Sequence, residues 1–336
     1  LFGIFADPII GLIGDTRFRR ALVVGGIAAT AIGLLLMGLG HSYALVLLAF
    51  VTLYIASGAY VNLAQATLVD RDVTRSEQTM ARWTLLGSIG VTVAPLAVTA
   101  LFYFGYGWRG LYLGLAGMAG LYTLLLLRPR FDAHSGAAEE NVSPRKLLRD
   151  LILGLRTPEL LRWILLTEFA DLMLDKLLEV TGLYFSDVVG VELAAASGAV
   201  ALFTMAGLIG NTVLLPALEK YDGRKVLRVS AFAVLVAYAA LLTVPVVWLK
   251  FALIAVISFS TAGWFPILRA QCYRVLPEQS GLVVAVTSLG SVFNFFVPYL
   301  IGRVADAFGL QWAMWLLILG PVALLIGLPR SANRNP

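Results

Sequence analysis

The sequence predicts an all-helical integral membrane protein. Hydrophobic residues make up 60% of the 336 residues and charged residues only 13%, with a mean hydropathy of +0.87. Soluble globular domains carry about 45–50% apolar and about 25% charged residues. Because a chain this apolar cannot bury its apolar surface by folding alone, we expect lipid to be its solvent.

The composition also excludes several kinds of site. A single cysteine, Cys272, gives neither a disulfide framework nor a cysteine metal cluster, and His41 and His134 are too far apart for metal-ligand spacing. The net charge is +5, but the basic residues lie in short loops between apolar runs, which is typical of membrane topology. We therefore expect no cofactor, no metal and no nucleic-acid partner.

Apolar runs long enough to cross the hydrocarbon core, which takes about 20 residues of helix, recur along the chain. They lie at roughly 21–39, 44–69, 84–104, 109–127, 160–185, 194–217, 226–247, 250–271, 280–301 and 311–329. Residues 1–14 are apolar but too short to span, and we interpret them as the end of a helix whose first part is missing. They lack the basic start and cleavage site of a signal peptide.

The lysines and arginines predict the orientation. Most of the 25 lie in one set of alternate loops, whereas the other set holds Arg109, Lys250 and Arg303. The positive-inside rule then places the first set, and with it the C-terminus, in the cytoplasm. We expect a multi-pass monomer in the inner (plasma) membrane of a cell, with the lipid bilayer as its surroundings.

An internal repeat divides the chain into two halves. Thr-Leu-Leu-Gly-Ser at 84–88 matches Thr-Ser-Leu-Gly-Ser at 287–291, and Pro95 matches Pro298. Two parallel repeats joined by a linker are a known plan of secondary transporters. The repeat therefore favours a transport protein built from two similar helical bundles.

We predict an N-terminal half at residues 1–127, a cytoplasmic linker at 128–159 and a C-terminal half at 160–336. Within the linker, Ser143-Pro144 is a helix-start signal. The apolar residues after it would share one face, which suits a helix lying on the membrane surface. These residues are Leu147, Leu148, Leu151, Ile152 and Leu155.

Residues 11–20, Gly-Leu-Ile-Gly-Asp-Thr-Arg-Phe-Arg-Arg, resemble the loop signature of the major facilitator superfamily, in which an aspartate follows a glycine by four residues and a basic cluster comes next. Residues 218–225 echo it in the second half, and 107–109 and 302–309 resemble two further loops of that superfamily. The resemblance covers essentially the whole chain. It implies a bundle of two pseudo-repeat halves, with about ten full transmembrane helices and a partial first one, which lacks helix 1 and the start of helix 2.

The loop signature also implies a conformational latch. In the superfamily the aspartate equivalent to Asp15 helps to hold the two halves together on the cytoplasmic side. The alternative is that the nearby arginines only anchor the topology. The expected latch residues are Gly11, Asp15, Arg19, Arg20, Glu219 and Arg224.

Four acids lie on one face of the predicted seventh helix, at Glu168, Asp171, Asp175 and Glu179. They fall within about 80° of arc and cover roughly 16 Å of helix. A carboxylate in hydrocarbon costs several kcal/mol, so such acids face the interior, pair, or stay protonated. We predict that Asp171, Asp175 and Glu168 bind the coupling proton or the substrate. The alternative is structural pairing, for which Lys176 stands close to Glu179.

Other polar residues in the predicted spans are further candidates for the substrate site. Asn62 and Gln65 are three residues apart on the predicted fourth helix, where they either contact substrate or hydrogen-bond between helices. Arg269, near the inner end of the tenth helix, either balances the acids of the seventh or extends to the membrane surface.

These observations predict secondary active transport of a small organic solute by alternating access, coupled to protons or another ion, with export favoured over uptake of a sugar or metabolite. No G-x-x-x-x-G-K-[ST] loop is present, so ATP is not the direct energy source. We predict no enzymatic activity, because the sequence has no Ser-His, H-E-x-x-H or metal constellation. The alternative is a transporter-like sensor or partner subunit that binds a ligand without moving it.

Overall fold

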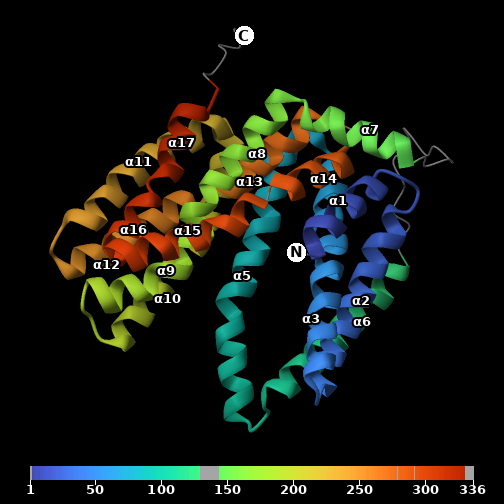
Figure 1. Cartoon of the computed structure of the whole chain (residues 1–336), viewed down its shortest axis with the longest axis horizontal. Coiled ribbons are helices and arrows are strands. Elements are labelled where there is room, and N and C mark those ends of the chain that lie inside the picture. Colours follow the sequence, from blue (N-terminus) through green and yellow to red (C-terminus); the bar gives the residue numbers. More distant parts are fainter. Residues whose placement is uncertain (1, 129–143, 278, 291, 330–336) are drawn as a thin grey trace. The chain divides into compact units, whose positions relative to one another are not determined.

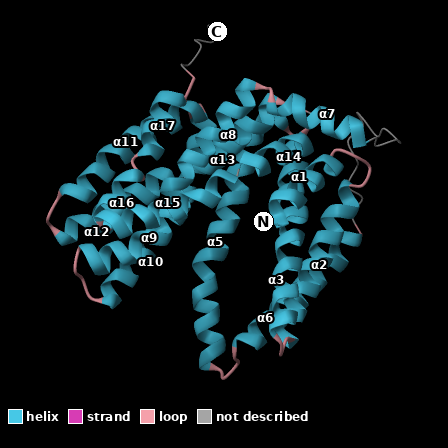
Figure 2. Cartoon of the chain, viewed as in Figure 1, coloured by secondary structure: helices cyan, strands magenta, loops and turns pink. Residues whose placement is uncertain are grey.

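The computed structural model of the chain describes residues 2–128, 144–277, 279–290 and 292–329. These residues form helices joined by short turns, with no strand among them (Figure 2), which confirms the all-helical prediction. The remaining part of the predicted linker, at 129–143, lies outside the described residues.

Eight helical segments in the described part of the chain are long and apolar enough to cross a membrane. They run Arg19–Leu39, Tyr43–Arg71, Val73–Tyr103, Trp108–Leu127, Leu193–Lys220, Gly223–Thr243, Val247–Val275 and Leu310–Gly327. The other two predicted spans are also helical. One carries the acidic residues of 168–179, whose charges lower its hydropathy, and the other comprises α14 (Ser280–Gly290) and α15 (Val292–Phe308), with residue 291 outside the described part of the chain.

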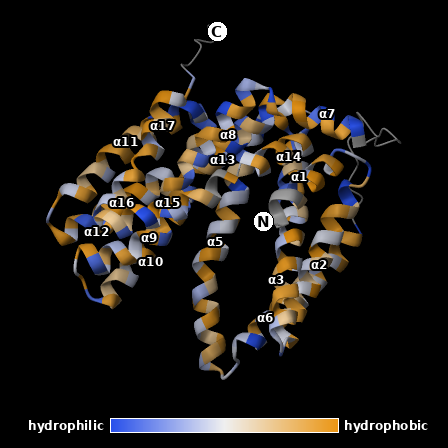
Figure 3. Cartoon of the chain, in the orientation of Figure 1, coloured by the Kyte–Doolittle hydropathy of each residue, from blue (hydrophilic) through white to orange (hydrophobic). Residues whose placement is uncertain are grey.

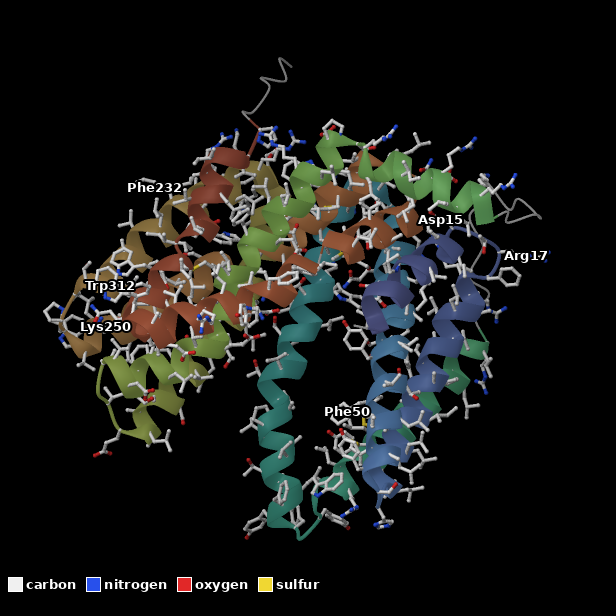
Figure 4. All side chains as sticks on the ribbon, in the orientation of Figure 1. Asp15, Arg17, Phe50, Phe232, Lys250 and Trp312 are labelled. Carbon is white, nitrogen blue, oxygen red and sulfur yellow. The ribbon has the colours of Figure 1, made fainter. Side chains whose placement is uncertain are left out.

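Hydrophobic residues are spread along the helices (Figure 3), and many of their large apolar side chains are exposed. Phe50, Phe232 and Trp312 are 55%, 62% and 61% exposed, and Figure 4 labels each of them. Contiguous apolar surface of this kind favours aggregation in water, whereas lipid tails solvate it at no cost. The apolar outer surface is therefore the side that faces the bilayer.

The first of two compact units comprises Leu1–Thr74, Val93–Leu160 and Tyr273–Gly290. Its helices are α1 (Phe2–Gly14), α2 (Arg19–Leu39), α3 (Tyr43–Ser57), the π-helical turn η1 (Gly58–Asn62), α4 (Leu63–Arg71), the 3-10 turn η2 (Val73–Arg75), α6 (Trp108–Leu127), α7 (Pro144–Leu155) and α14. In this unit α2 packs against α3 and α6, and α1 lies along α14 (Figure 1). The unit thus joins the start of the chain to a helix from its last quarter. Helix α7 begins at Pro144 as predicted.

Glycines allow the backbones of the first unit to approach closely. A Cβ atom on Gly26 would lie 3.0 Å from the backbone nitrogen of Tyr60, so α2 contacts η1 directly at this point. On either side of Gly26, Val23 and Ile27 pack with Leu63 to form a buried cluster. Small residues at helix contacts are the usual means of association in membranes, where no hydrophobic force draws helices together.

The second unit comprises Arg75–Thr92, Leu161–Cys272 and Ser291–Pro336. Its helices are the first part of α5 (Ser76–Tyr103), α8 (Pro158–Asp171), η3 (Leu172–Lys176), α9 (Leu177–Leu183), η4 (Tyr184–Val188), α10 (Leu193–Lys220), α11 (Gly223–Thr243), α12 (Val247–Thr261), α13 (Trp264–Val275), α15, α16 (Leu310–Leu316) and α17 (Leu319–Gly327). Helix α12 packs against both α10 and α11. The boundaries predicted from the sequence at 127/128 and 159/160 stay a prediction.

Lys250 is a buried lysine in the first turn of α12, beside the end of α11 in the second unit. Its Nζ atom donates hydrogen bonds to the Tyr184 hydroxyl at 2.8 Å and to the carbonyl oxygen of Leu241 (Figure 4). Only 7% of the residue is exposed. Because the last carbonyls of a helix lack partners and carry partial negative charge, the ammonium group stabilises the end of α11.

We expect Lys250→Met to lower the stability of the second unit by about 1–3 kcal/mol, because it leaves buried oxygen acceptors without their donor. Thermal unfolding of the purified protein in detergent measures this effect. Lys225→Met, at an exposed position of α11, is the matched control. Equal melting temperatures for the two variants would contradict a stabilising role for the buried ammonium.

Candidate functional site

Asp15 lies in the turn after α1 and caps the N-terminus of α14 (Figure 4 labels Asp15). Its Oδ1 and Oδ2 atoms accept hydrogen bonds from the backbone N–H groups of Gly281 and Leu282, both at 2.7 Å. The first N–H groups of a helix have no partner within the helix, and the helix dipole favours negative charge there. The Asp15 carboxylate thus joins the turn after α1 to a helix far along the chain.

Arg19, the first residue of α2, completes the network around Asp15. Its guanidinium donates to Asp15 Oδ1 at 2.7 Å, to Asp70 Oδ2 and to Ser280 Oγ at 2.9 Å. The Ser280 hydroxyl in turn donates to Asp70. Two carboxylates, one arginine and a helix N-terminus therefore form a closed arrangement, and charge-assisted bonds of this kind are about twice as strong as neutral ones.

The charge of Asp15 depends on these partners. Burial raises the pKa of Asp15 above its ordinary value, the nearby Asp70 carboxylate raises it further, and Arg19 with the two backbone N–H groups oppose both effects. With a raised pKa, the carboxyl binds its proton more tightly in the folded protein than in the unfolded chain. The network therefore loses the Asp15 charge at a higher pH than an ordinary aspartate would.

Glycines bring α1 and α14 together beneath this network. A Cβ atom on Gly11 would lie 2.6 Å from the nitrogen of Ala285, and one on Gly281 would lie 2.3 Å from the carbonyl oxygen of Gly11. Neither position has room for a side chain. The glycine of the loop signature thus sets the close approach that lets Asp15 reach the end of α14.

The structure brings together some of the predicted latch residues and leaves others apart. Gly11, Asp15 and Arg19 meet, whereas Arg20 donates to the carbonyl oxygen of Leu127 at the end of α6, at 2.9 Å. Glu219 is exposed and has no hydrogen bond or ion pair among the described residues. Asp70 and Ser280 were missed by the sequence analysis. The only indication in the sequence was the position of Asp70, directly after the predicted span at 44–69 and beside a basic loop.

The second unit holds a separate polar network at the start of α11. Gln271 Nε2 donates to Glu77 Oε1 at 2.7 Å, and Arg224 donates to Gln271 Oε1 at 3.2 Å. Glu77 is only 6% exposed, and its carboxylate lies where a side chain on Gly223 would be, 2.5 Å from that Cβ position. Arg224 is therefore connected to an acidic residue through Gln271, and this residue is Glu77 on α5, not Glu219.

The four acids of the predicted seventh helix all lie in the second unit. Glu168 and Asp171 belong to α8, Asp175 to the π-helical turn η3, and Glu179 to α9. The carboxyl groups of Asp171 and Asp175 lie close enough to influence each other, and Lys176 acts on Asp171 as well. Two ionised carboxyl groups repel and have no hydrogen-bond donor, whereas one proton between them supplies a donor and removes the repulsion. The pair is therefore a candidate proton-binding site.

The turn η3 sets the spacing of this carboxyl pair. Asp171 immediately precedes it and Asp175 lies within it. A π-helical turn is wider than an α-helical turn and is frequently found at functional sites. The prediction of one acidic face used regular α-helix geometry, and no feature of the sequence indicated this π-helical turn.

The flanking acids have basic partners. Lys176 Nζ bonds Glu179 Oε1 at 2.8 Å, with 56% of the Glu179 side chain exposed, so structural pairing accounts for Glu179. Glu168 on α8 lies close enough to Arg269 on α13 to feel its positive charge. Arg269 is buried, at 9% exposure, which fits charge balance better than extension to the membrane surface. One Glu168 oxygen, Oε2, is buried without a hydrogen-bond partner among the described residues.

Asn62 and Gln65 belong to the first unit. Asn62 ends η1 and is half-buried, and Gln65 on α4 is 5% exposed. The Oε1 atom of Gln65 has no hydrogen-bond partner in the described part of the chain. A buried amide oxygen of this kind is available to a ligand, and the substrate role of both residues stays a prediction.

Among the described residues, no three His, Cys, Asp or Glu side chains are placed to hold a metal ion. The chemistry that these residues offer is proton binding by carboxyl groups and charge balance by buried arginine and lysine.

Comparison with known proteins places these features in a family. The family model of the Major Facilitator Superfamily matches residues 1–294. Among curated proteins, none matches the chain.

Solved structures with the same fold include the E. coli fucose:proton symporter FucP, with a TM-score of 0.82 at 15% identity, covering 97% of this chain and 87% of that one. The human organic anion transporter TETRAN matches with a TM-score of 0.79 at 16% identity, covering 97% and 81%. The proton:xylose symporter XylE matches with a TM-score of 0.68 at 15% identity, covering 96% and 83%.

We expect Asp15→Asn to loosen the first turn of α14. The amide lacks the negative charge to which the N–H groups of Gly281 and Leu282 and the Arg19 guanidinium donate. Losing about 1–3 kcal/mol should speed hydrogen exchange of the Gly281 and Leu282 amides roughly tenfold or more. Asp306→Asn, at an exposed position, serves as control. Unchanged exchange at both amides would show that the cap does not hold α14.

We expect Gln271→Glu to lower the melting temperature of the protein, since it places a second carboxylate against Glu77 at a cost of about 1–3 kcal/mol. The exchange variant Glu77→Gln/Gln271→Glu should recover most of the loss, because an amide again faces a carboxylate. Gln311→Glu, on an exposed face of α16, controls for added charge. Failure of the exchange variant to recover stability would contradict a direct bond between these residues.

Proposed function

This chain belongs to the major facilitator superfamily of secondary transporters, and on that premise we propose that it moves a small organic solute across the inner membrane of a cell by alternating access, driven by a proton gradient. It is a transporter and not an enzyme. Its arginine-rich loops and its C-terminus then face the cytoplasm, according to the positive-inside rule.

The closeness of the Asp171 and Asp175 carboxyl groups, which influence each other in the acidic segment, is the observation that supports the proposed proton coupling. Taking up one proton lets the two groups bond, and losing it leaves two like charges side by side in a membrane-spanning segment. Protonation therefore changes the relative free energy of conformations that hold the pair together and conformations that separate it. A carrier can use that difference to link proton movement to a change of shape.

The charges around the pair suit such a role. Lys176 bonds Glu179 and also acts on Asp171, and Arg269 acts on Glu168, so these two basic groups partly offset the four acids of the segment. An acidic site attracts a cationic solute, or admits a neutral one, more readily than an anion. We therefore propose a cationic or neutral solute, and we favour export.

Uptake of a neutral, sugar-like solute is the second candidate. Two of the solved structures with this fold are a fucose:proton and a proton:xylose symporter. At 15% identity these likenesses concern the fold, so they motivate a substrate screen that includes sugars.

The network of Asp15, Arg19 and Asp70 supplies a conformational element for this cycle. It ties α1, α2 and α4 to the N-terminus of α14 by bonds that either all form or all break. Packed contacts of this kind have discrete arrangements and do not deform continuously. We propose that this network is the cytoplasmic latch, closed in the state described and opened when the carrier turns inward.

Proton flux in liposomes tests the proposal. The full-length protein is reconstituted in liposomes that contain a pH-sensitive dye, and cationic and neutral solutes, including sugars, are screened for solute-dependent proton movement. We expect Asp171→Asn and Asp175→Asn to reduce that movement roughly 100-fold, the lower range for removing a proton-transfer group. Asp187→Asn, an exposed acid near the end of η4, is the control.

The other outcomes distinguish the alternatives. Solute flux that ignores both substitutions and the pH gradient would leave a transporter whose coupling site lies elsewhere. Ligand binding without flux for any solute would favour a transporter-like sensor or partner subunit.

A further inference from the structure

Asp7 is a carboxyl group in the middle of α1 that has no part in the Asp15 network or in the acidic segment of the second unit. Helix α1 packs against α14 and η1, with smaller contacts to α3 and α2, all within the first unit. Asp7 was not predicted as a site residue from the sequence, because the apolar stretch that contains it is too short to be assigned as a complete span.

The carboxyl group of Asp7 lies directly on Gly58, the first residue of η1. A Cβ atom on Gly58 would lie 2.1 Å from Asp7 Oδ1 and 2.9 Å from Asp7 Cγ. No side chain fits between them, so the glycine provides the space that the carboxyl fills. The π-helical turn that starts at Gly58 is the segment against which this acid packs.

Asp7 has no charged or hydrogen-bonding partner in the described part of the chain. Its Oδ1 atom is buried without a hydrogen bond. The titratable side chains on the elements packed against α1 are Arg19 and Arg20 on α2, Tyr43 and Tyr54 on α3, and Tyr60 on η1, while α14 has none. Arg19 is bound to Asp15 and Asp70, and Arg20 to the end of α6.

An ionised carboxylate would be unfavourable in this place. Inside a membrane, a charged group persists only with a partner or with water, and otherwise takes the neutral form. A protonated carboxyl group is a hydrogen-bond donor, whereas an ionised one only accepts. The burial of Oδ1 without a hydrogen-bond donor beside it therefore favours the neutral acid.

We propose that Asp7 is a second proton-binding site of this protein, occupied by a proton while its carboxyl group lies against Gly58. Release of that proton leaves a charge on Oδ1 without a partner, which drives the carboxylate away from Gly58 and loosens α1 from η1. Protonation of Asp7 is thereby linked to helix packing in the first unit. The part that Asp7 plays in transport rests on the proton coupling proposed above, but its protonation does not.

Infrared spectroscopy of the purified full-length protein tests the protonation directly, because a protonated carboxyl group absorbs apart from an ionised one. At neutral pH we expect Asp7→Asn to remove the absorption of one protonated carboxyl group. Gly58→Ala keeps the acid but fills its space, and should remove the same absorption by forcing the carboxyl group out to where it ionises. Gly25→Ala, whose added methyl group meets nothing within 4 Å, and Asp306→Asn are the controls and should leave the spectrum unchanged.

A wild-type spectrum for Asp7→Asn or for Gly58→Ala would overturn the proposal, and the second variant decides the matter if the first does not fold. In liposomes, Asp7→Asn should abolish solute accumulation driven by a pH gradient while downhill solute exchange persists. If Asp7→Asn moves protons and solute in the wild-type ratio, Asp7 has no role in transport. If Asp171→Asn loses proton movement in the same experiment, the proposed function is retained. Absence of proton movement in the wild type would refute the proposed function, and the infrared result would still decide whether Asp7 holds a proton.

Discussion

The cost of burying an unpartnered charge governs the surroundings of the buried acids of this protein. Asp15 meets that constraint with two backbone N–H groups at 2.7 Å and with Arg19. Because the N–H groups belong to the first turn of α14, satisfying one carboxylate fixes the position of a helix that follows it by more than half the chain. The glycines at 11 and 281 serve this interaction, since any side chain there would separate the two backbones.

The proposals above assign a second way of meeting this constraint, in which an acid binds a proton. Asp171 and Asp175 share one between them, and Asp7 holds one while it lies against Gly58. Both places adjoin a π-helical turn, η3 in the second unit and η1 in the first. A π-helical turn interrupts the regular helix, so both sites lie where the helix widens.

The two polar networks show how the internal repeat is used. Asp15 in the first unit and Glu77 in the second both lie against a glycine next to a helix N-terminus, and each network contains an arginine from the loop signature or its echo. The acids do not occupy matching positions, however. The first unit takes its acid from the loop itself and the second takes it from the start of α5, because Glu219 points to the exterior and Gln271 lies between Arg224 and Glu77.

The sequence by itself determined that this protein is helical and membrane-embedded, because a chain in lipid needs an apolar composition and apolar runs about as long as the hydrocarbon core is thick. It also pointed to Asp15 and Arg19 through the loop signature at residues 11–20, and to the acids at 168–175 because charges are rare in apolar runs. Only the tertiary structure decided the partners: Asp70 and Ser280 for Arg19, Glu77 for Gln271, and Gly58 for Asp7. These pairs join residues from different helices, and their distance along the chain leaves no periodic pattern for a sequence to reveal.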